Sequence, residues 1–161
     1  MANWIDPVYD RTEEDVEFAS KKIAEWIAAD ITGNPLVVYD LKGCLNVSDI
    51  NRIEGNISYL SRQLSDSYYS PDTSSKSWTE SGMPNEQDIK RILYNVSALI
   101  TAFYQPKGAP TIPTNMLGYY EVNAVEENLY LIKQLLDNMV NSFRKSSTFQ
   151  SGSTFRLPIR R

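Results

Sequence analysis

The sequence contains no histidine, which removes the side chain that enzymes use most often for proton transfer and the commonest metal ligand. It has a single cysteine, Cys44, so no disulfide can form within the chain. No apolar run approaches the about 18 residues that a membrane helix needs, and the acidic N-terminal stretch lacks the hydrophobic region of a secretion signal. We therefore expect no membrane span and no export by a signal peptide.

Acidic residues are absent after Asp137, although the whole chain carries a net charge of −4. A negative net charge gives no general reason to bind nucleic acid. The basic residues beyond Asp137 are Arg144, Lys145, Arg156, Arg160 and Arg161. The sequence thus predicts an acidic body and a basic end. Residues 146–161 have no helical periodicity, and we expect them to form an extended arm.

Two stretches, residues 49–60 and 88–99, spell nearly the same phrase, DINRIEGNISYL and DIKRILYNVSAL. Apolar residues recur in both at steps of three and four, which is typical of an amphipathic helix. Weaker copies of the phrase begin at Asp15 and at Glu121. The copies predict four helices, at about 12–31, 46–66, 85–104 and 118–143.

Capping residues open these predicted helices. A polar residue stands three positions before the first acidic residue of a copy, as in a capping box. The pairs are Thr12 with Asp15, Asn46 with Asp49, and Asn85 with Asp88. An amide also recurs beside the apolar stripe, at Asn56, Asn95 and Asn128. We expect each amide to bond to a neighbouring loop backbone, with a shared polar ligand site as the alternative.

The predicted fold class is all-α: a four-helix, antiparallel-leaning bundle with long ordered loops and a C-terminal extended arm. Residues 1–145 would form the helical domain and residues 146–161 the basic arm. One domain suits a chain of 161 residues.

Catalytic patterns are missing from the sequence. Nucleophile systems that depend on histidine are impossible, and no glycine-rich phosphate loop is present. Adjacent carboxylates occur at Glu13–Glu14 and Glu126–Glu127, and we expect them to be solvated charges rather than an acid–base pair. The expectation is a protein that is not an enzyme and uses no cofactor or metal.

The predicted loops contain aromatic residues that suggest one kind of ligand surface. These residues are Tyr68, Tyr69, Trp78, Tyr119 and Tyr120. Exposed together on one face, the rings would make a carbohydrate-recognising helical module, because aromatic faces stack on sugars. The alternative is that the rings attach the long loops to the core.

The arm has a composition suited to a protein partner. Its candidate contact residues are Phe149, Phe155, Arg156, Leu157, Ile159, Arg160 and Arg161. An extended apolar segment can add to a sheet edge or fill a groove. Its basic charge favours an acidic neighbour, including another copy of this chain.

Four phrases follow one another in a fixed order: WIDPVYDRTEEDV, KGCLNVSDINRIEGNISYL, MPNEQDIKRILYNVSAL and PTIPTNMLGYYEVNAVEENLYLI. In this order the chain, from Trp4 to about Phe143, resembles small tail- or baseplate-associated structural proteins from late gene modules of phages and prophages of Gram-positive bacteria. The matching residues are Arg11, Thr12, Asp15 and Val16 in the first phrase and Lys42, Gly43, Asn46, Asp49, Asn51, Arg52, Ile53, Glu54 and Asn56 in the second.

This resemblance implies a non-enzymatic virion structural or assembly protein, and it implies no catalytic residues. Its expected partners are other phage structural proteins or further copies of itself. Its expected location is the bacterial cytoplasm during assembly, with the virion as a further location to test.

Overall fold

The computed structural model describes residues 3–31, 40–79, 82 and 84–147. These ranges contain no strand and four helices: α1 (Glu13–Ile31), α2 (Val47–Asp66), α3 (Glu86–Ala102) and α4 (Tyr119–Ser147). The predicted all-α, four-helix fold class is confirmed. Helix α4 continues to Ser147, two residues into the predicted arm, and residues 148–161 lie outside the described part of the chain.

Capping boxes fix where the first three helices begin, as the sequence predicts. In each box the backbone N–H of the polar residue donates to the carboxylate three positions later. The donor–acceptor distances are 2.9 Å for Thr12–Asp15, 3.0 Å for Asn46–Asp49 and 3.2 Å for Asn85–Asp88. The carboxylates also lie at the positive ends of their helices, which favours a negative charge there.

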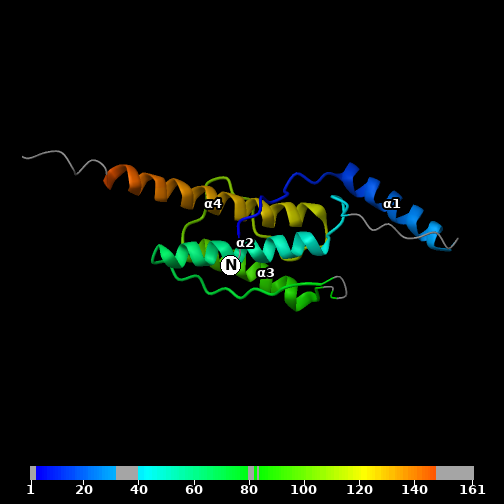
Figure 1. Ribbon diagram of the computed structural model, residues 1–161, viewed down its shortest axis with the longest axis horizontal. Coiled ribbons are helices and arrows are strands. Elements are labelled where there is room, and N and C mark those ends of the chain that lie inside the picture. Colours follow the sequence, from blue (N-terminus) through cyan, green and yellow to red (C-terminus); the bar gives the residue numbers. More distant parts are fainter. Residues whose placement is uncertain (1–2, 32–39, 80–81, 83, 148–161) are drawn as a thin grey trace, which may run out of the picture.

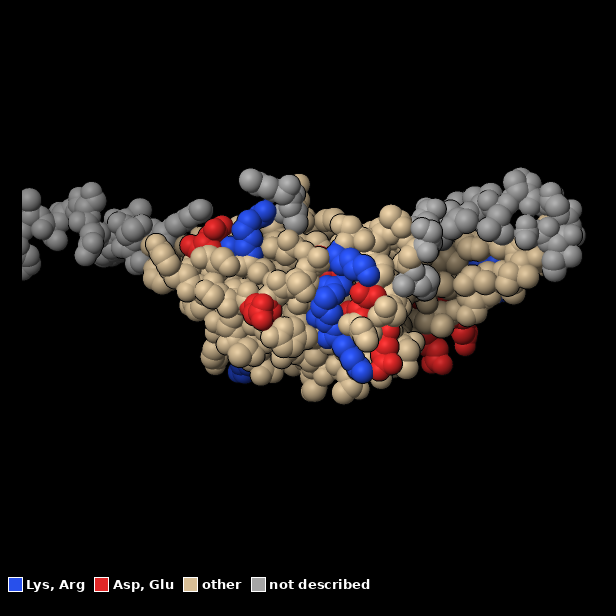
Figure 2. Space-filling view, turned by 90° about the horizontal axis from the view of Figure 1, so that it is seen from below, with Lys and Arg blue, Asp and Glu red and all other residues tan. Residues whose placement is uncertain are grey.

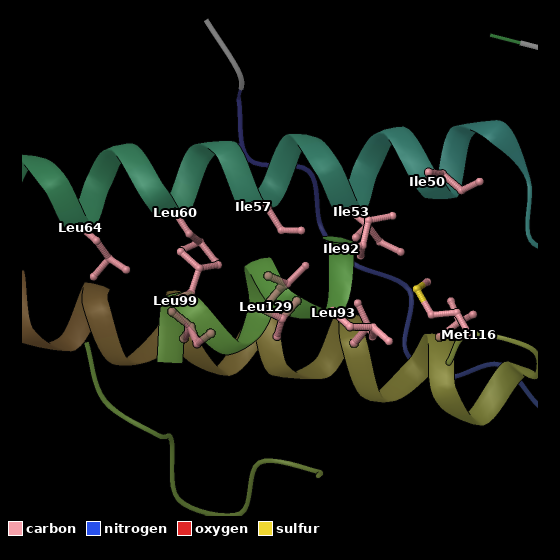
Figure 3. Close-up of a cluster of buried hydrophobic side chains, with 14 of the residues drawn as sticks. Ile50, Ile53, Ile57, Leu60, Leu64, Ile92, Leu93, Leu99, Met116 and Leu129 are labelled. Atoms are coloured by element: carbon pink, nitrogen blue, oxygen red, sulfur yellow. The ribbon is translucent and has the colours of Figure 1, made fainter. Parts of the chain in front are cut away.

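The core lies between three helices and not four. The apolar stripe of α2, from Ile50 to Leu64, faces the stripes of α3 and α4 (Figure 3). Trp78 and Met116, from the two long connections, complete the buried cluster. Among the described residues, none of this cluster comes from α1, which projects from one end of the bundle (Figure 1).

The three packed helices run in the same direction, so the predicted antiparallel arrangement is wrong (Figure 1). Their N-terminal turns meet at one end, where Arg52 of α2 contacts Glu126 of α4 at 2.7 Å. Their later turns meet at the other end, where Tyr69 packs edge-on against Phe103 and contacts Met139. Parallel neighbours need a return path as long as the helix, and the long connections 67–85 and 103–118 provide it.

Three irregular segments lie along the seams between these helices. We call residues 3–11, 72–79 and 110–117 the seam segments. Asn56, Asn95 and Asn128, the recurring amides of the repeated phrase, each bond to the backbone of one of them. Asn56 pairs with both the N–H and the C=O of Ile5, at 3.0 and 2.7 Å, and Asn95 pairs in the same way with Ser74, at 3.1 and 2.6 Å. The predicted bonding of these amides to loop backbone is confirmed.

A second set of amides holds the far ends of two seam segments. Asn51 of α2 pairs with both backbone groups of Trp78, at 2.8 and 3.0 Å. Asn123 of α4 does the same for Arg11, at 3.3 and 2.9 Å. Each of these two segments is therefore bonded to both helices that form its seam. The third segment places residues 114–117 against the first turns of α3.

The seam segments reveal that α1 is an insertion. The second and third segments lead directly into the helix whose amide binds them, α3 through Asn95 and α4 through Asn128. The first segment is bound by Asn56 of α2 in the same way, but residues 12–46 intervene before α2 begins. Residues 13–31 and 40–44, which we call the excursion, lie outside the buried core cluster, and Leu45, which packs against that cluster, marks the return to the bundle.

We expect Asn95→Leu to lower the free energy of unfolding by about 1–3 kcal/mol, because the N–H of Ser74 would lose its partner and the C=O of Ser74 would keep only the Arg91 guanidinium. Asn128→Leu should cost clearly less, because Pro110 has no N–H and the Oδ1 of Asn128 already lacks a partner. Urea unfolding of the two variants measures the difference. Equal losses would show that backbone pairing at Ser74 does not stabilise the fold.

Candidate functional site

The excursion is the part of the described chain that the core does not need. It leaves and returns at one place, which we call the neck, formed by residues 10–15 and 41–46. Lys42 Nζ lies 3.1 Å from Asp10 Oδ2 and 3.3 Å from Asp15 Oδ2, so one ammonium group joins the two chain segments of the neck. A Cβ atom on Gly43 would lie 2.0 Å from the carbonyl oxygen of Asp15, so only glycine fits there.

Beyond the neck, α1 exposes large apolar side chains. Ile23 and Ile27 are 38% and 58% exposed, and Phe18 is 55% exposed. Ile57, the residue of α2 that corresponds to Ile23 in the repeated phrase, is fully buried. An amphipathic helix that keeps apolar residues in water is typical of a surface that another molecule covers.

A buried group of four charges anchors the base of the neck. Arg11 donates to Asp49 at 2.9 Å and to Glu126 at 3.0 Å, and Arg52 contacts the same two carboxylates. The side chains of Arg11 and Glu126 are 2% and 0% exposed. Two positive and two negative charges balance, which is the condition for keeping ions in a protein interior. Glu126 also accepts from the backbone of Val8, so the group joins the first seam segment to α2 and α4.

The pKa values at this network reflect both burial and pairing. Burial alone would raise the pKa of the Asp49 carboxyl, but the Asn46 backbone, Arg52 and Arg11 together lower it. For Arg52, burial would lower the pKa of the guanidinium, while Glu126 and Asp49 raise it. Burial raises the pKa of the nearby Cys44 thiol, with a further contribution from the charge of Asp49. Asp49 and Arg52 therefore stay ionised near neutral pH, and the Cys44 thiol stays protonated.

A second buried carboxylate occupies the equivalent place between α2 and α3. Glu54 accepts from Arg91, from the indole N–H of Trp78 at 3.3 Å and from the backbone N–H of Lys76 at 3.3 Å. Glu54 and Glu126 stand at the same position of the repeated phrase, five residues after its first acid. The expectation of a solvated Glu126 is wrong, because Glu126 is fully buried and pairs with Arg11 and Arg52. The shared position in the phrase, beside the apolar stripe, was the signal that could have found it.

The five predicted ring residues do not form one surface. Trp78 is 7% exposed and packs in the core, and Tyr69 packs on Phe103. Tyr68 is 98% exposed at the C-terminal end of α2, whereas Tyr119 and Tyr120 stack on each other at the N-terminal end of α4. Parallel packing puts these two groups at opposite ends of the bundle. The condition that the carbohydrate hypothesis sets is therefore not met.

Other kinds of site find little support in the described ranges. No group of three or more Cys, Asp or Glu side chains could hold a metal ion there, and no described helix is long and apolar enough to cross a membrane. Figure 2 shows basic groups beside acidic ones on one face, in line with ion pairs such as Lys76–Asp88 and Lys90–Glu86. The predicted arm contacts, Phe149 to Arg161, lie outside the described residues. Comparison with models of protein families, with curated proteins and with solved structures found no match to this chain.

We expect Glu126→Leu to lower the free energy of unfolding by about 3–5 kcal/mol, because removing one partner leaves buried positive charge uncompensated. The matched control is Glu86→Gln, which breaks an exposed pair with Lys90 and should change stability little. Chemical denaturation at neutral pH compares the two. A mild effect of Glu126→Leu would mean that water or another carboxylate compensates Arg11 and Arg52.

Acid should destabilise the fold partly through Asp49. Its pKa is lower in the folded chain than the about 3.9 of an unfolded aspartate, so its contribution is complete above that value and is lost as pH falls through the folded pKa. Asp15 and Asp88, whose pKa values are also lowered by capping and ion pairing, act in the same direction. We expect Asp49→Asn to be less stable at pH 7 and to lose less stability on acidification. Parallel stability curves for the two proteins between pH 7 and pH 3 would contradict this.

Proposed function

We propose that this chain is a non-enzymatic structural or assembly protein of a phage tail, acting through protein–protein contacts. In this proposal α2, α3 and α4 form a rigid platform and the excursion is the docking element. The observation that carries the proposal is the exposed apolar side of α1, at Ile23 and Ile27, on a helix outside the core cluster. A helix that only served stability would bury these residues in its own chain.

The form of the platform supports the same proposal. The seam amides fix two of the three seam segments at two points each, at Ile5 and Arg11 for the first segment and at Ser74 and Trp78 for the second. A rigid base keeps the excursion in one orientation. Preorganised elements lose less conformational freedom when they bind a partner.

The resemblance to tail- and baseplate-associated proteins gives the proposal its setting. Under it, the chain is present in the bacterial cytoplasm during assembly and then in the virion. The matching residues include several with structural roles. Arg11, Asp49 and Arg52 belong to the buried network, and Gly43 packs against the backbone of Asp15 within the neck. The matching phrases therefore contain the residues that hold the excursion on the platform.

The test is a deletion of the coding sequence in the phage or prophage that encodes the chain, followed by electron microscopy of the particles. We expect absent or incomplete tails, restored by the wild-type chain and by Phe18→Lys but not by Ile27→Lys. Phe18 is the matched control, because it is as exposed as Ile27 but lies about 180° away around α1. Normal tails in the absence of the chain would overturn the proposal.

A further inference from the structure

The exposed apolar side of α1 is bordered by acidic residues. Helix α1 contains six acidic and two basic residues. At about 100° per residue, Glu13 and Glu17 lie within about 80° of Ile27, whereas Lys21 and Lys22 lie at least about 120° away. A ligand for this side would therefore combine apolar side chains with positive charge.

The arm of this same chain has that composition. Phe155, Leu157 and Ile159 are interspersed with Arg156, Arg160 and Arg161, Phe149 precedes them, and no acidic residue follows Asp137. The arm and the Ile23–Ile27 side of α1 thus have opposite charges, and each also has apolar side chains. Complementary charge of this kind orients partners and speeds their association.

An arm cannot reach the α1 of its own chain. Helix α4 has 29 residues and is about 43 Å long, and the excursion projects from the opposite end of the bundle (Figure 1). Reaching Ile27 requires this whole length and about 20 Å more along α1. Residues 148–161 span at most about 50 Å when fully extended. An arm that docks on α1 must therefore use the α1 of a second copy.

We propose that residues 146–161 of one copy dock on the Ile23–Ile27 side of α1 in a second copy. This inference rests on the proposed function and names the partner of its docking element. The two contacting surfaces differ, so the contact is head-to-tail. Such contacts repeat until they close a ring or form a filament, which suits a protein that builds part of a larger particle.

The experiment uses the full chain with a photo-crosslinking phenylalanine analogue in place of Phe155. Equal amounts of isotope-labelled and unlabelled chains are mixed, irradiated and digested, and the crosslinks are assigned by mass spectrometry. We expect crosslinks between labelled and unlabelled chains that map to α1 around Ile23 and Ile27. Crosslinks confined to the same chain, or mapping to α2, α3 or α4 instead, would overturn the inference.

Light scattering over a range of concentrations provides an independent readout. We expect the full chain to self-associate, and Ile27→Lys to weaken association about tenfold or more, because it replaces an apolar contact by a charge that repels the arm. Phe18→Lys, the matched control, should leave association unchanged. Raising the salt concentration should weaken association by screening the charges. A full chain that stays monomeric, or equal effects of the two substitutions, would refute docking between copies.

The two proposals can fail separately. If the chain is monomeric in solution and yet Ile27→Lys prevents tail assembly, the docking of the arm is refuted and the proposed function stands. If the copies associate through α1 and the arm but tails form normally without the chain, the docking stands and the tail function is refuted.

Discussion

Pairing of the backbone groups that lie against the helices is the constraint on which the rest of this structure depends. Three helices that pack in parallel force the chain to return twice along the outside of the bundle. Each return brings peptide N–H and C=O groups against the helices, and such groups cost free energy when they lose water without finding a partner. Asparagine side chains resolve the conflict, because one amide offers both a donor and an acceptor to the backbone N–H and C=O of one residue. Asn51, Asn56, Asn95 and Asn123 each make such a pair.

Ion pairs between neighbouring helices recur in the same way as the asparagine contacts. Arg52 of α2 pairs with Glu126 of α4, and Arg91 of α3 pairs with Glu54 of α2, so two of the three seams have an arginine facing a buried glutamate. At the equivalent positions of the third seam stand Leu93 and Ala124, which need no partner. The bundle is therefore built on a threefold arrangement of seams. Two seams have a pair of arginine and glutamate, and the third has two apolar residues at the equivalent positions. Arg11 is the added element, and it places an extra charge where the excursion begins.

The excursion is the part of the chain that departs from this threefold arrangement. Helix α1 has the same kind of capping box as α2 and α3, yet it lies outside the core that α2, α3 and α4 close. Ile23 and Ile27 on this helix are exposed. In the proposal they contact another molecule, and the acidic residues beside them favour a basic one. The neck contacts of Lys42 and Gly43 hold α1 at a fixed place on the platform. In the proposed function, the platform sets the position and α1 makes the contact.

The sequence by itself determined what depends on neighbours along the chain. Capping residues such as Asn85 and Asp88 and the apolar steps from Ile50 to Leu64 act within a few residues, so the helices and their first turns could be predicted closely. The repeated amides also predicted bonds to loop backbone, because a polar group beside an apolar stripe needs a partner. The tertiary structure alone decided which segments those partners are, that the packed helices run parallel and that α1 leaves the core. It also decided that Glu126 is buried. These outcomes depend on contacts between residues more than one hundred positions apart, such as Val8 with Glu126, and no local pattern encodes such distances.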